Sequence, residues 1–299
     1  MKGNKIILSF CFSIMVVCCL SIFPKNVLAA VLYLQPENKN AFLKEVFLEK
    51  VFVDTEGESI NAIEAEIKYP KDILKVKTIS TGNSILKLFV KEPKEENGKI
   101  TFIGGVPGGY QGKNGLLILI AFEVINKKEA KIEIEETSRV ILNDGKGTEA
   151  KTKKESAKIN IFESEKKRDE WEEFIKKDKN PPEPFEIKLS RSPYIFDNKY
   201  FISFAAFDKE SGIDYYEVAE LLKEESQKEL NWKKTKSPYL LEDQSLKSKI
   251  FVKAVDKAGN ERIEVLDPKK NSQIFIILAI IIFIGFFGFI FVKLKRRQK

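Results

Sequence analysis

Two long apolar segments bracket this 299-residue chain and constrain the location of everything between them. The first 29 residues begin with Lys2 and Lys5, continue through an apolar run and end in the small residue Ala29. This layout is typical of a secretory signal peptide that is cleaved between Ala29 and Ala30. Near the other end, an uninterrupted apolar stretch of 19 residues runs from Ile274 to Val292. In a helix it is just long enough to cross a bilayer core of about 30 Å.

The residues after this apolar stretch indicate the orientation of the chain in a membrane. The tail 293–299 contains five basic residues and no acidic one, and the positive-inside rule places such a tail in the cytoplasm. We therefore predict a signal peptide over 1–29, a single transmembrane helix over 274–292 that contacts the lipid bilayer, and a cytoplasmic basic tail over 293–299. The predicted localisation is the cell membrane, with an extracellular N-terminal ectodomain.

The composition of the predicted ectodomain excludes several classes of function. Eight of the 51 basic residues lie in the two terminal segments, which leaves 43 against 44 acidic residues, so no nucleic acid is expected as a partner. All three cysteines lie in the predicted signal peptide, and the chain has no histidine. The commonest general base and the commonest soft-metal ligand are therefore missing. We expect no catalytic residues, no cofactor and no enzymatic activity.

Short apolar runs separated by turn residues predict an all-β fold for residues 30–162. The runs are 31–34, 46–53, 60–69, 73–79, 85–90, 99–103, 116–125, 131–135, 138–142 and 157–162. In 60–69, apolar residues alternate with charged ones, so one face of that strand should pack on a core while the other meets water. The run Leu116–Val124 is apolar on both faces except at Glu123, which predicts a central strand. This regular spacing is typical of a β-sandwich.

The order of several short motifs in this segment resembles a cohesin domain. A Tyr69-Pro70 turn follows the alternating strand, and the strand Gly98-Lys99-Ile100-Thr101-Phe102, the loop Gly104–Gly109 and the turn Leu142–Gly145 follow in that order. The resemblance covers residues 30–162 and implies a jelly-roll β-sandwich shared with a class of carbohydrate-binding modules. It also implies non-catalytic recognition, either of a dockerin-like module on another protein or of polysaccharide, in polysaccharide degradation or adhesion.

Residues 163–184 and 185–268 are expected to form a linker and a second, smaller domain. Trp171, Phe174 and Ile175 stand at helical spacing in a charged stretch, and three prolines follow at 181, 182 and 184, which predicts a short helix and a stiff linker. We expect Trp171 to be a packing contact of that helix rather than a binding aromatic. The motifs Asp208–Ile213 and Ala254–Asn260 resemble bacterial Ig-like or fibronectin-III-like modules, which implies a small β-sandwich spacer over 185–268.

Two sets of residues are candidates for binding. A protein partner would dock on an outward sheet face, for which the candidates are Glu64, Glu66, Lys68, Lys87, Lys99 and Thr101. A polysaccharide would instead stack on exposed aromatic side chains, for which Phe89 and Tyr110 are the candidates. A planar row of exposed aromatics would favour the polysaccharide, and a flat polar face with a few apolar residues would favour the protein. An unbroken scatter of lysine and glutamate would favour a structural cell-envelope protein with no specific ligand.

Two acidic loops contain residue types that are common in calcium-binding loops. Asn143–Gly147 and Asp256–Asn260 combine aspartate, asparagine and glycine, but both lack the full EF-hand pattern with its glutamate at the twelfth position. Hairpin turns with glycine at positive φ explain both loops better. We therefore predict no metal ligands, while calcium at Asp144 or Asp256 stays open from the sequence alone.

Overall fold

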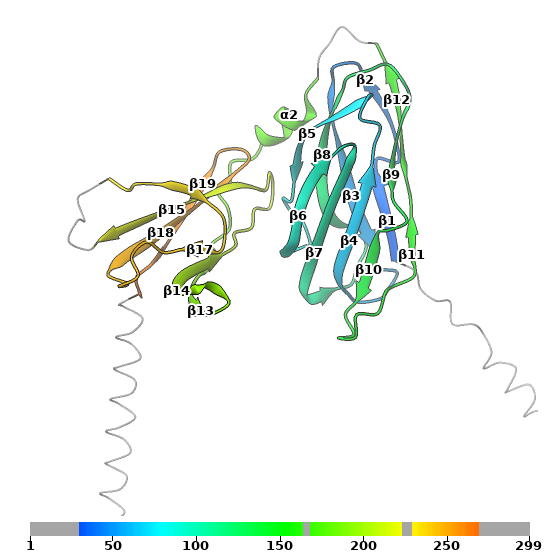
Figure 1. Cartoon of the computed structure of the whole chain (residues 1–299). Helices are drawn as coiled ribbons and strands as arrows, with labels where there is room; N and C mark the ends of the chain where they lie inside the picture. The colour runs from blue at the N-terminus through cyan, green and yellow to red at the C-terminus, as the bar shows by residue number, and fades with distance from the viewer. Residues whose placement is uncertain (1–29, 164–167, 223–228, 269–299) are drawn as a thin grey trace, which may run out of the picture.

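Residues 30–163, 168–222 and 229–268 are described by the computed structural model, which is almost entirely β (Figure 1). We call residues 30–162 the N-terminal sandwich and residues 185–268 the C-terminal unit. The predicted signal peptide, transmembrane helix and basic tail lie outside the described residues. Within the described ranges, no helix is both long enough and apolar enough to cross a membrane.

The first sheet of the N-terminal sandwich contains five strands in the order β11-β1-β3-β8-β5. These strands are β1 (Ala30–Gln35), β3 (Val46–Asp54), β5 (Leu74–Ser80), β8 (Gly115–Val124) and β11 (Thr152–Lys154). β8 lies between β3 and β5 and is buried along most of its length, as its apolar composition predicts. On the inner face of the sheet, Phe47 lies opposite Phe122 with ring centroids 5.7 Å apart.

The second sheet has the order β2-β12-β9-β4-β7-β6, with β10 also paired to β4. Its strands are β2 (Asn38–Phe42), β4 (Ile60–Lys68), β6 (Leu88–Glu96), β7 (Lys99–Tyr110), β9 (Ala130–Ile134), β10 (Arg139–Leu142) and β12 (Ala157–Phe162). The predicted alternation of β4 is confirmed, because Ile63, Ala65 and Ile67 are buried whereas Glu64 and Glu66 are partly exposed. Successive side chains of a strand point to opposite faces of the sheet, so all the charged side chains of β4 project from the same face.

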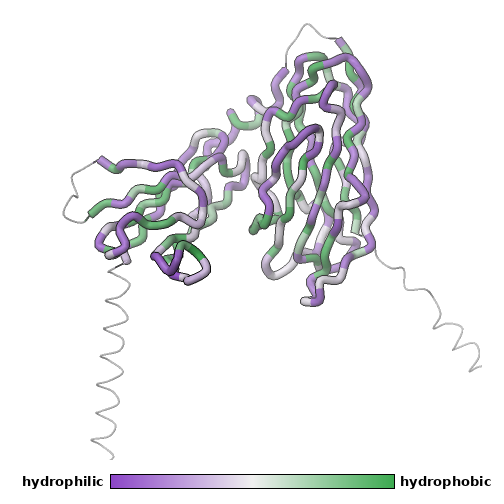
Figure 2. Tube along the Cα trace, viewed as in Figure 1, coloured by the Kyte–Doolittle hydropathy of each residue, from purple (hydrophilic) through white to green (hydrophobic). Residues whose placement is uncertain are grey.

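The core of the N-terminal sandwich lies between these two sheets. Phe47, Phe102 and Phe122 are among its largest fully buried side chains, and apolar residues from both sheets surround them. Each such side chain contributes about 1.5–3 kcal/mol when it leaves water. Figure 2 shows the resulting pattern, in which hydrophobic and hydrophilic residues alternate along the strands. A β-sandwich fold of this segment, as predicted, is therefore confirmed.

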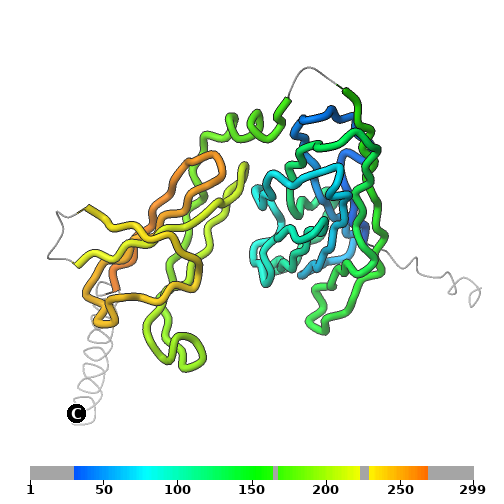
Figure 3. Tube along the Cα trace, turned by 45° about the horizontal axis from the view of Figure 1, so that its top comes forward, coloured from blue at the N-terminus to red at the C-terminus, as the bar shows by residue number. Residues whose placement is uncertain are grey.

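The helix α2 (Glu170–Ile175) covers part of the outer face of the five-stranded sheet. Asp169 caps its N-terminus by accepting a hydrogen bond from the Glu172 amide at 2.9 Å. Trp171 is only 6% exposed and packs with Leu119 and Ala121 of β8. The expectation that Trp171 makes a packing contact is thus confirmed. Figure 3 shows this short green helix beside the segment that leads into the C-terminal unit.

The C-terminal unit has two smaller sheets, with orders β13-β14-β17 and β16-β15-β18-β19. The strands are β13 (Ile187–Ser192), β14 (Ile195–Phe204), β15 (Ile213–Leu222), β16 (Lys233–Thr235), β17 (Tyr239–Leu240), β18 (Ser248–Asp256) and β19 (Glu261–Leu266). Its core includes Ile202, Val218 and Val252, which are fully buried. The unit is all-β as predicted, and its Ig-like character stays a prediction from the sequence motifs.

The two β units touch each other at the end of β5. The Asn83 amide donates a hydrogen bond of 3.1 Å to the backbone oxygen of Asp208, in the β14–β15 loop. Gly82 lies so close to this loop that a Cβ atom there would be 1.9 Å from the backbone oxygen of Glu210. Glycine is therefore required at position 82 for the units to approach in this way.

The predicted strand positions differ from the structure mainly at the polar elements. The run 85–90 was expected as a strand, whereas β6 spans Leu88–Glu96 and contains two irregularities in its pairing with β7. β6 is an edge strand that is rich in lysine, glutamate and proline, so it lacks the apolar alternation on which such predictions rest. β2 and β11 had no apolar pattern and were missed for the same reason.

Candidate binding surface

The outward side of the β10–β4–β7 region forms a polar face with a small apolar centre. We call it the β4–β7 face, and its outward side chains are Ala62, Glu64, Glu66, Lys68, Lys99, Thr101, Ile103 and Arg139. Five of the residues predicted for protein docking lie here together: Glu64, Glu66, Lys68, Lys99 and Thr101. The pairing register brings them together, because Glu66 lies opposite Thr101 and Lys68 lies opposite Lys99. Figure 1 shows β4, β7 and β10 side by side.

Ion pairs between neighbouring strands fix the charged side chains of this face. Arg139 of β10 donates from Nε to Glu64 at 3.1 Å, and Lys99 of β7 pairs with Glu66 of β4. The hydrogen bond and the charge of Glu66 together raise the pKa of Lys99. Exposed pairs of this kind contribute about 0–1 kcal/mol to stability. Their larger effect is to hold alternating charges in a fixed pattern that a partner can recognise.

The middle of the face is small and apolar. Ile103 lies opposite Glu64, and Ala62 lies opposite Gly105, which has no side chain. Thr101 precedes Ile103 on the same side of β7, and both are half-buried. A small apolar centre surrounded by ordered polar groups is the general anatomy of a protein–protein interface. No aromatic residue lies among the outward side chains of this face.

The outer face of the five-stranded sheet, on the other side of the sandwich, is partly covered by α2. The side chains of Trp171, Phe174 and Ile175 lie over Leu48 and Leu119 of the five-stranded sheet. Glu170 reinforces the contact, because its carboxylate accepts hydrogen bonds from the Leu48 amide at 2.8 Å and from Lys39. The β4–β7 face has no such cover from the described residues.

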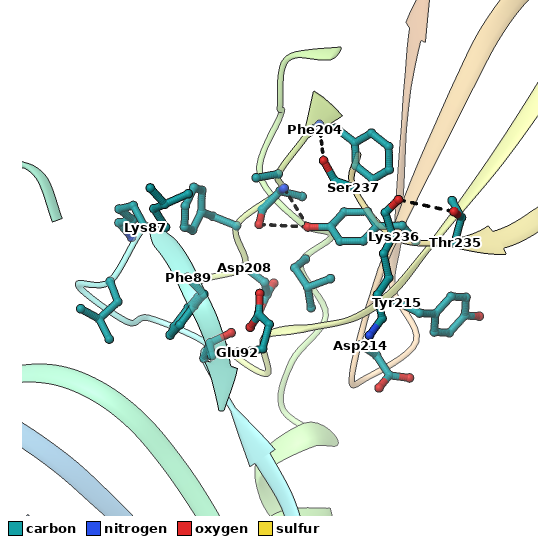
Figure 4. A pocket seen from close by; sticks show the side chains of 18 of the residues that line it. Lys87, Phe89, Glu92, Phe204, Asp208, Asp214, Tyr215, Thr235, Lys236 and Ser237 are labelled. Carbon is teal, nitrogen blue, oxygen red and sulfur yellow. Dashed lines mark hydrogen bonds between the residues drawn. The ribbon is translucent and has the colours of Figure 1, made fainter. Parts of the chain in front are cut away.

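Lys87 and Phe89 lie apart from the β4–β7 face, at a pocket between the two units (Figure 4). The pocket has a volume of about 710 Å³ and is lined from the C-terminal unit by Phe204, Tyr215 and Lys236. The Lys87 ammonium stands 4.5 Å above the ring of Phe207, and its pKa is lowered by burial and by the charge of Lys209. Lys87 was predicted on the docking face, but the structure places it at this junction.

The two aromatic residues predicted for stacking are not presented to solvent as a platform. Phe89 and Tyr110 are partly buried and pack against the core of the N-terminal sandwich. The Tyr110 hydroxyl donates to the backbone oxygen of Lys113 at 3.0 Å, and its ring lies against Gly112 and Gly115. The exposed aromatic side chains of the described residues are elsewhere, at Phe42, Phe162, Tyr194 and Phe196.

The two acidic loops form turns, as predicted, with Gly145, Gly147 and Gly259 at positive φ. A cluster of three buried aspartates was missed, however, and it contains the first residue of the second loop. The carboxylates of Asp178, Asp208 and Asp256 offer oxygens within 4.8 Å of one another, a spacing that a metal ion could bridge. These residues lie far apart in the sequence, and only the fold brings them together.

Comparisons with known proteins identify similar solved structures but no family. No family model and no curated protein matches the chain. A non-cellulosomal cohesin from the hyperthermophilic archaeon Archaeoglobus fulgidus is 15% identical over 46% of this chain and 94% of its own, with a TM-score of 0.39. R. flavefaciens' third ScaB cohesin, in complex with a group 1 dockerin, is 12% identical over 47% of this chain and 100% of its own, with a TM-score of 0.38. CaCohA2 from Clostridium acetobutylicum is 14% identical over 44% of this chain and 90% of its own, with a TM-score of 0.37. Both the sequence identity and the TM-score are low in each case.

Proposed function

We propose that this chain is a non-catalytic, membrane-anchored cell-surface protein whose β4–β7 face binds another protein. The observation that carries the proposal is the composition of that face, where a small apolar centre at Ala62 and Ile103 is framed by ion pairs. Such a surface suits a folded protein partner, which can match both the apolar patch and the charge pattern.

The partner that we propose is a dockerin-like module. This part of the proposal rests on the motifs that resemble a cohesin domain in residues 30–162, which correspond to the strands that form the β4–β7 face. The proposed location follows from the two terminal apolar segments, which would secrete the chain and hold it at the membrane with the N-terminal sandwich outside. In this arrangement the C-terminal unit and the linker hold the sandwich away from the bilayer.

The experiment that tests the proposal is capture of partners by the full-length chain from the secreted fraction of the source organism, beside a glycan array. The disruptive variant is Ile103→Arg, which places a charge in the apolar centre. We expect the wild-type chain to retain a protein that the variant loses, because a long charged side chain would then occupy the apolar centre that the partner must cover.

The control is Lys50→Glu on β3, which changes an exposed charge on the other sheet and leaves the β4–β7 face as it is. It should retain the partner as the wild type does. Retention by Ile103→Arg as well, or retention of a glycan with no protein, would contradict protein docking through this face. A wild-type chain that retains neither ligand would favour the purely structural envelope protein.

A further inference from the structure

The junction between the linker and the C-terminal unit contains three aspartates whose side chains are almost completely buried. Asp178 follows α2, Asp208 lies in the β14–β15 loop, and Asp256 ends β18. They are 3%, 6% and 2% exposed, respectively. One carboxylate oxygen of each lies within 4.8 Å of one carboxylate oxygen of the others.

Most oxygens of the cluster are used by neighbouring donors, but one is not. Asp178 accepts from the Ser211 amide at 3.1 Å, and Asp256 accepts from the Asn260 amide at 2.8 Å. Asp208 accepts from the Gly212 amide at 2.7 Å through Oδ2. Its other oxygen, Oδ1, is buried and has no hydrogen-bond partner among the described residues. The buried hydroxyl of Ser211, beside Asp178, is unpartnered in the same sense.

The charge of the cluster is also uncompensated. No lysine or arginine side chain in the described part of the chain forms an ion pair with Asp178, Asp208 or Asp256. The side-chain amide of Asn260 donates hydrogen bonds to both Asp178 and Asp256, but it is neutral. Burial raises the pKa of Asp208, and the charges of Asp178 and Asp256 raise it further. Buried carboxylates without a cation repel one another, and a bound metal ion removes that repulsion.

We propose that Asp178, Asp208 and Asp256 bind one Ca²⁺ ion, which fastens the linker to the C-terminal unit. Two oxygens that each lie about 2.4 Å from one ion can be at most about 4.8 Å apart, and the three carboxylate oxygens meet this limit for sharing one Ca²⁺ ion. The unused Asp208 Oδ1 is then a ligand. All the side-chain donors are oxygens, without the nitrogen or sulfur that zinc prefers.

The surroundings of the cluster give the ion both an entry route and a structural consequence. Asp208 lies at the wall of the pocket between the two units, which opens to solvent (Figure 4). Asp178 belongs to the segment that follows α2, and α2 is packed on the N-terminal sandwich. An ion shared by Asp178, Asp208 and Asp256 therefore ties the sandwich to the C-terminal unit through the linker.

The first test is a calcium titration of the full-length chain, purified in a mild detergent because of its apolar C-terminal run and freed of metal with a chelator. Calorimetry should show about one Ca²⁺ per chain, with a Kd no weaker than about 10⁻³ M, as in extracellular calcium modules. Binding to the folded state should also raise the unfolding temperature. No heat and no thermal shift at about 10⁻² M Ca²⁺, or equal effects of Mg²⁺, would overturn the proposal.

The second test compares Asp208→Asn with Asp144→Asn, a matched change in the exposed Asn143–Gly147 turn. Asp208→Asn keeps an acceptor for the Gly212 amide but replaces Oδ1 by an amide nitrogen, so Ca²⁺ affinity should fall at least tenfold. Without calcium, Asp208→Asn should be as stable as the wild type or more stable, because one repelling charge is gone. Asp144→Asn should bind calcium as the wild type does. Unchanged affinity in Asp208→Asn would overturn the site, and the wild-type titration decides even if that variant does not fold.

Limited proteolysis adds an independent readout of the tie between the units. Trypsin should cut the linker after Lys176, Lys177 or Lys179 more slowly when calcium is present. The protection should be at least severalfold in the wild type and absent in Asp208→Asn. A calcium-bound wild type that is cut as fast as the chelated one would contradict the proposed fastening of the linker.

Discussion

The Ser80 hydroxyl donates a hydrogen bond of 2.6 Å to the backbone oxygen of Ser211, which joins the end of β5 to the β14–β15 loop. Both serines are buried, and the same Ser80 hydroxyl accepts from the Gly82 amide at 3.0 Å. Leaving a buried polar group unpaired costs about 1–3 kcal/mol, so this bond favours the docked arrangement of the two units. The N-terminal sandwich and the C-terminal unit therefore stabilise each other.

Gly82→Ala should uncouple the two units. The new methyl group would collide with the backbone oxygen of Glu210, and relieving that collision requires the β14–β15 loop to move away. We expect the interaction free energy between the two units to fall by about 1–3 kcal/mol. The two units should then unfold in separate transitions, which scanning calorimetry would show as a split endotherm. The control is Gly105→Ala, where the nearest atom would be at an ordinary 3.6 Å. If Gly82→Ala unfolds like the control, the contact between Gly82 and the β14–β15 loop does not stabilise the protein.

Trp171→Ala should detach α2 from the sandwich. The indole is almost fully buried over β8, and truncation of such a side chain typically costs about 3–5 kcal/mol. Denaturant titration should show this loss. Glu172→Ala, a change on the exposed side of the same helix, should cost less than about 1 kcal/mol. A similar cost for the two substitutions would contradict the packing role of Trp171.

The elements that the sequence predicts well are those in which burial alternates or is continuous. β4 was predicted because its apolar and charged residues take opposite faces, and β8 because it is apolar on both. Edge strands such as β6 carry no such pattern, because lysine, glutamate and proline protect an open sheet edge and blur the apolar period. The helix was predicted from the spacing of Trp171, Phe174 and Ile175, but nothing local indicates the sheet face on which it packs.

The same distinction separates the predicted and the missed parts of the candidate sites. The polar residues of the β4–β7 face follow from strand alternation, which places Glu64, Glu66 and Thr101 on one side. Lys87 was assigned to that face wrongly, because the β5–β6 connection that carries it turns toward the C-terminal unit. The aspartate cluster combines the segment after α2, the β14–β15 loop and the end of β18, which only the tertiary fold brings together. The composition of the Asp256 loop therefore indicates one member of the cluster and not the other two.

Glu49 should make the stability of the chain depend on pH. It is 0% exposed, and neither carboxylate oxygen has a hydrogen-bond partner among the described residues. Burial raises its pKa from 4.5 to about 8, although the charge of Lys39 opposes the shift. The folded state therefore holds a proton that the unfolded state releases above pH 4.5. The free energy of unfolding should fall between about pH 4.5 and pH 8, by up to roughly 5 kcal/mol, and then level off.

Glu49→Gln tests this assignment, because glutamine has the shape of the protonated acid and cannot ionise. The variant should match the wild type near pH 4.5 and exceed it increasingly up to pH 8, as measured by urea unfolding at several pH values. The control Glu123→Gln, on the neighbouring strand β8 but partly exposed, should keep the wild-type slope. A wild type whose stability is flat over this range would show that Glu49 titrates normally.

The charge pattern of the β4–β7 face, rather than its net charge, should determine partner binding. The swap Glu66→Lys with Lys99→Glu preserves the ion pair between β4 and β7 and changes stability by less than about 1 kcal/mol. It reverses the two charges that a partner meets, so the affinity for a captured protein partner should fall at least tenfold, mainly at low salt, where exposed charges are least screened. The measurement is surface plasmon resonance at about 0.05 M and about 0.5 M salt, with a swap of Lys153 and Glu155, an exposed ion pair at β11 of the five-stranded sheet, as the control. Equal affinities of the swapped chain, the control and the wild type at low salt would mean that the partner does not read these charges, and the docking site would then lie elsewhere on the sandwich.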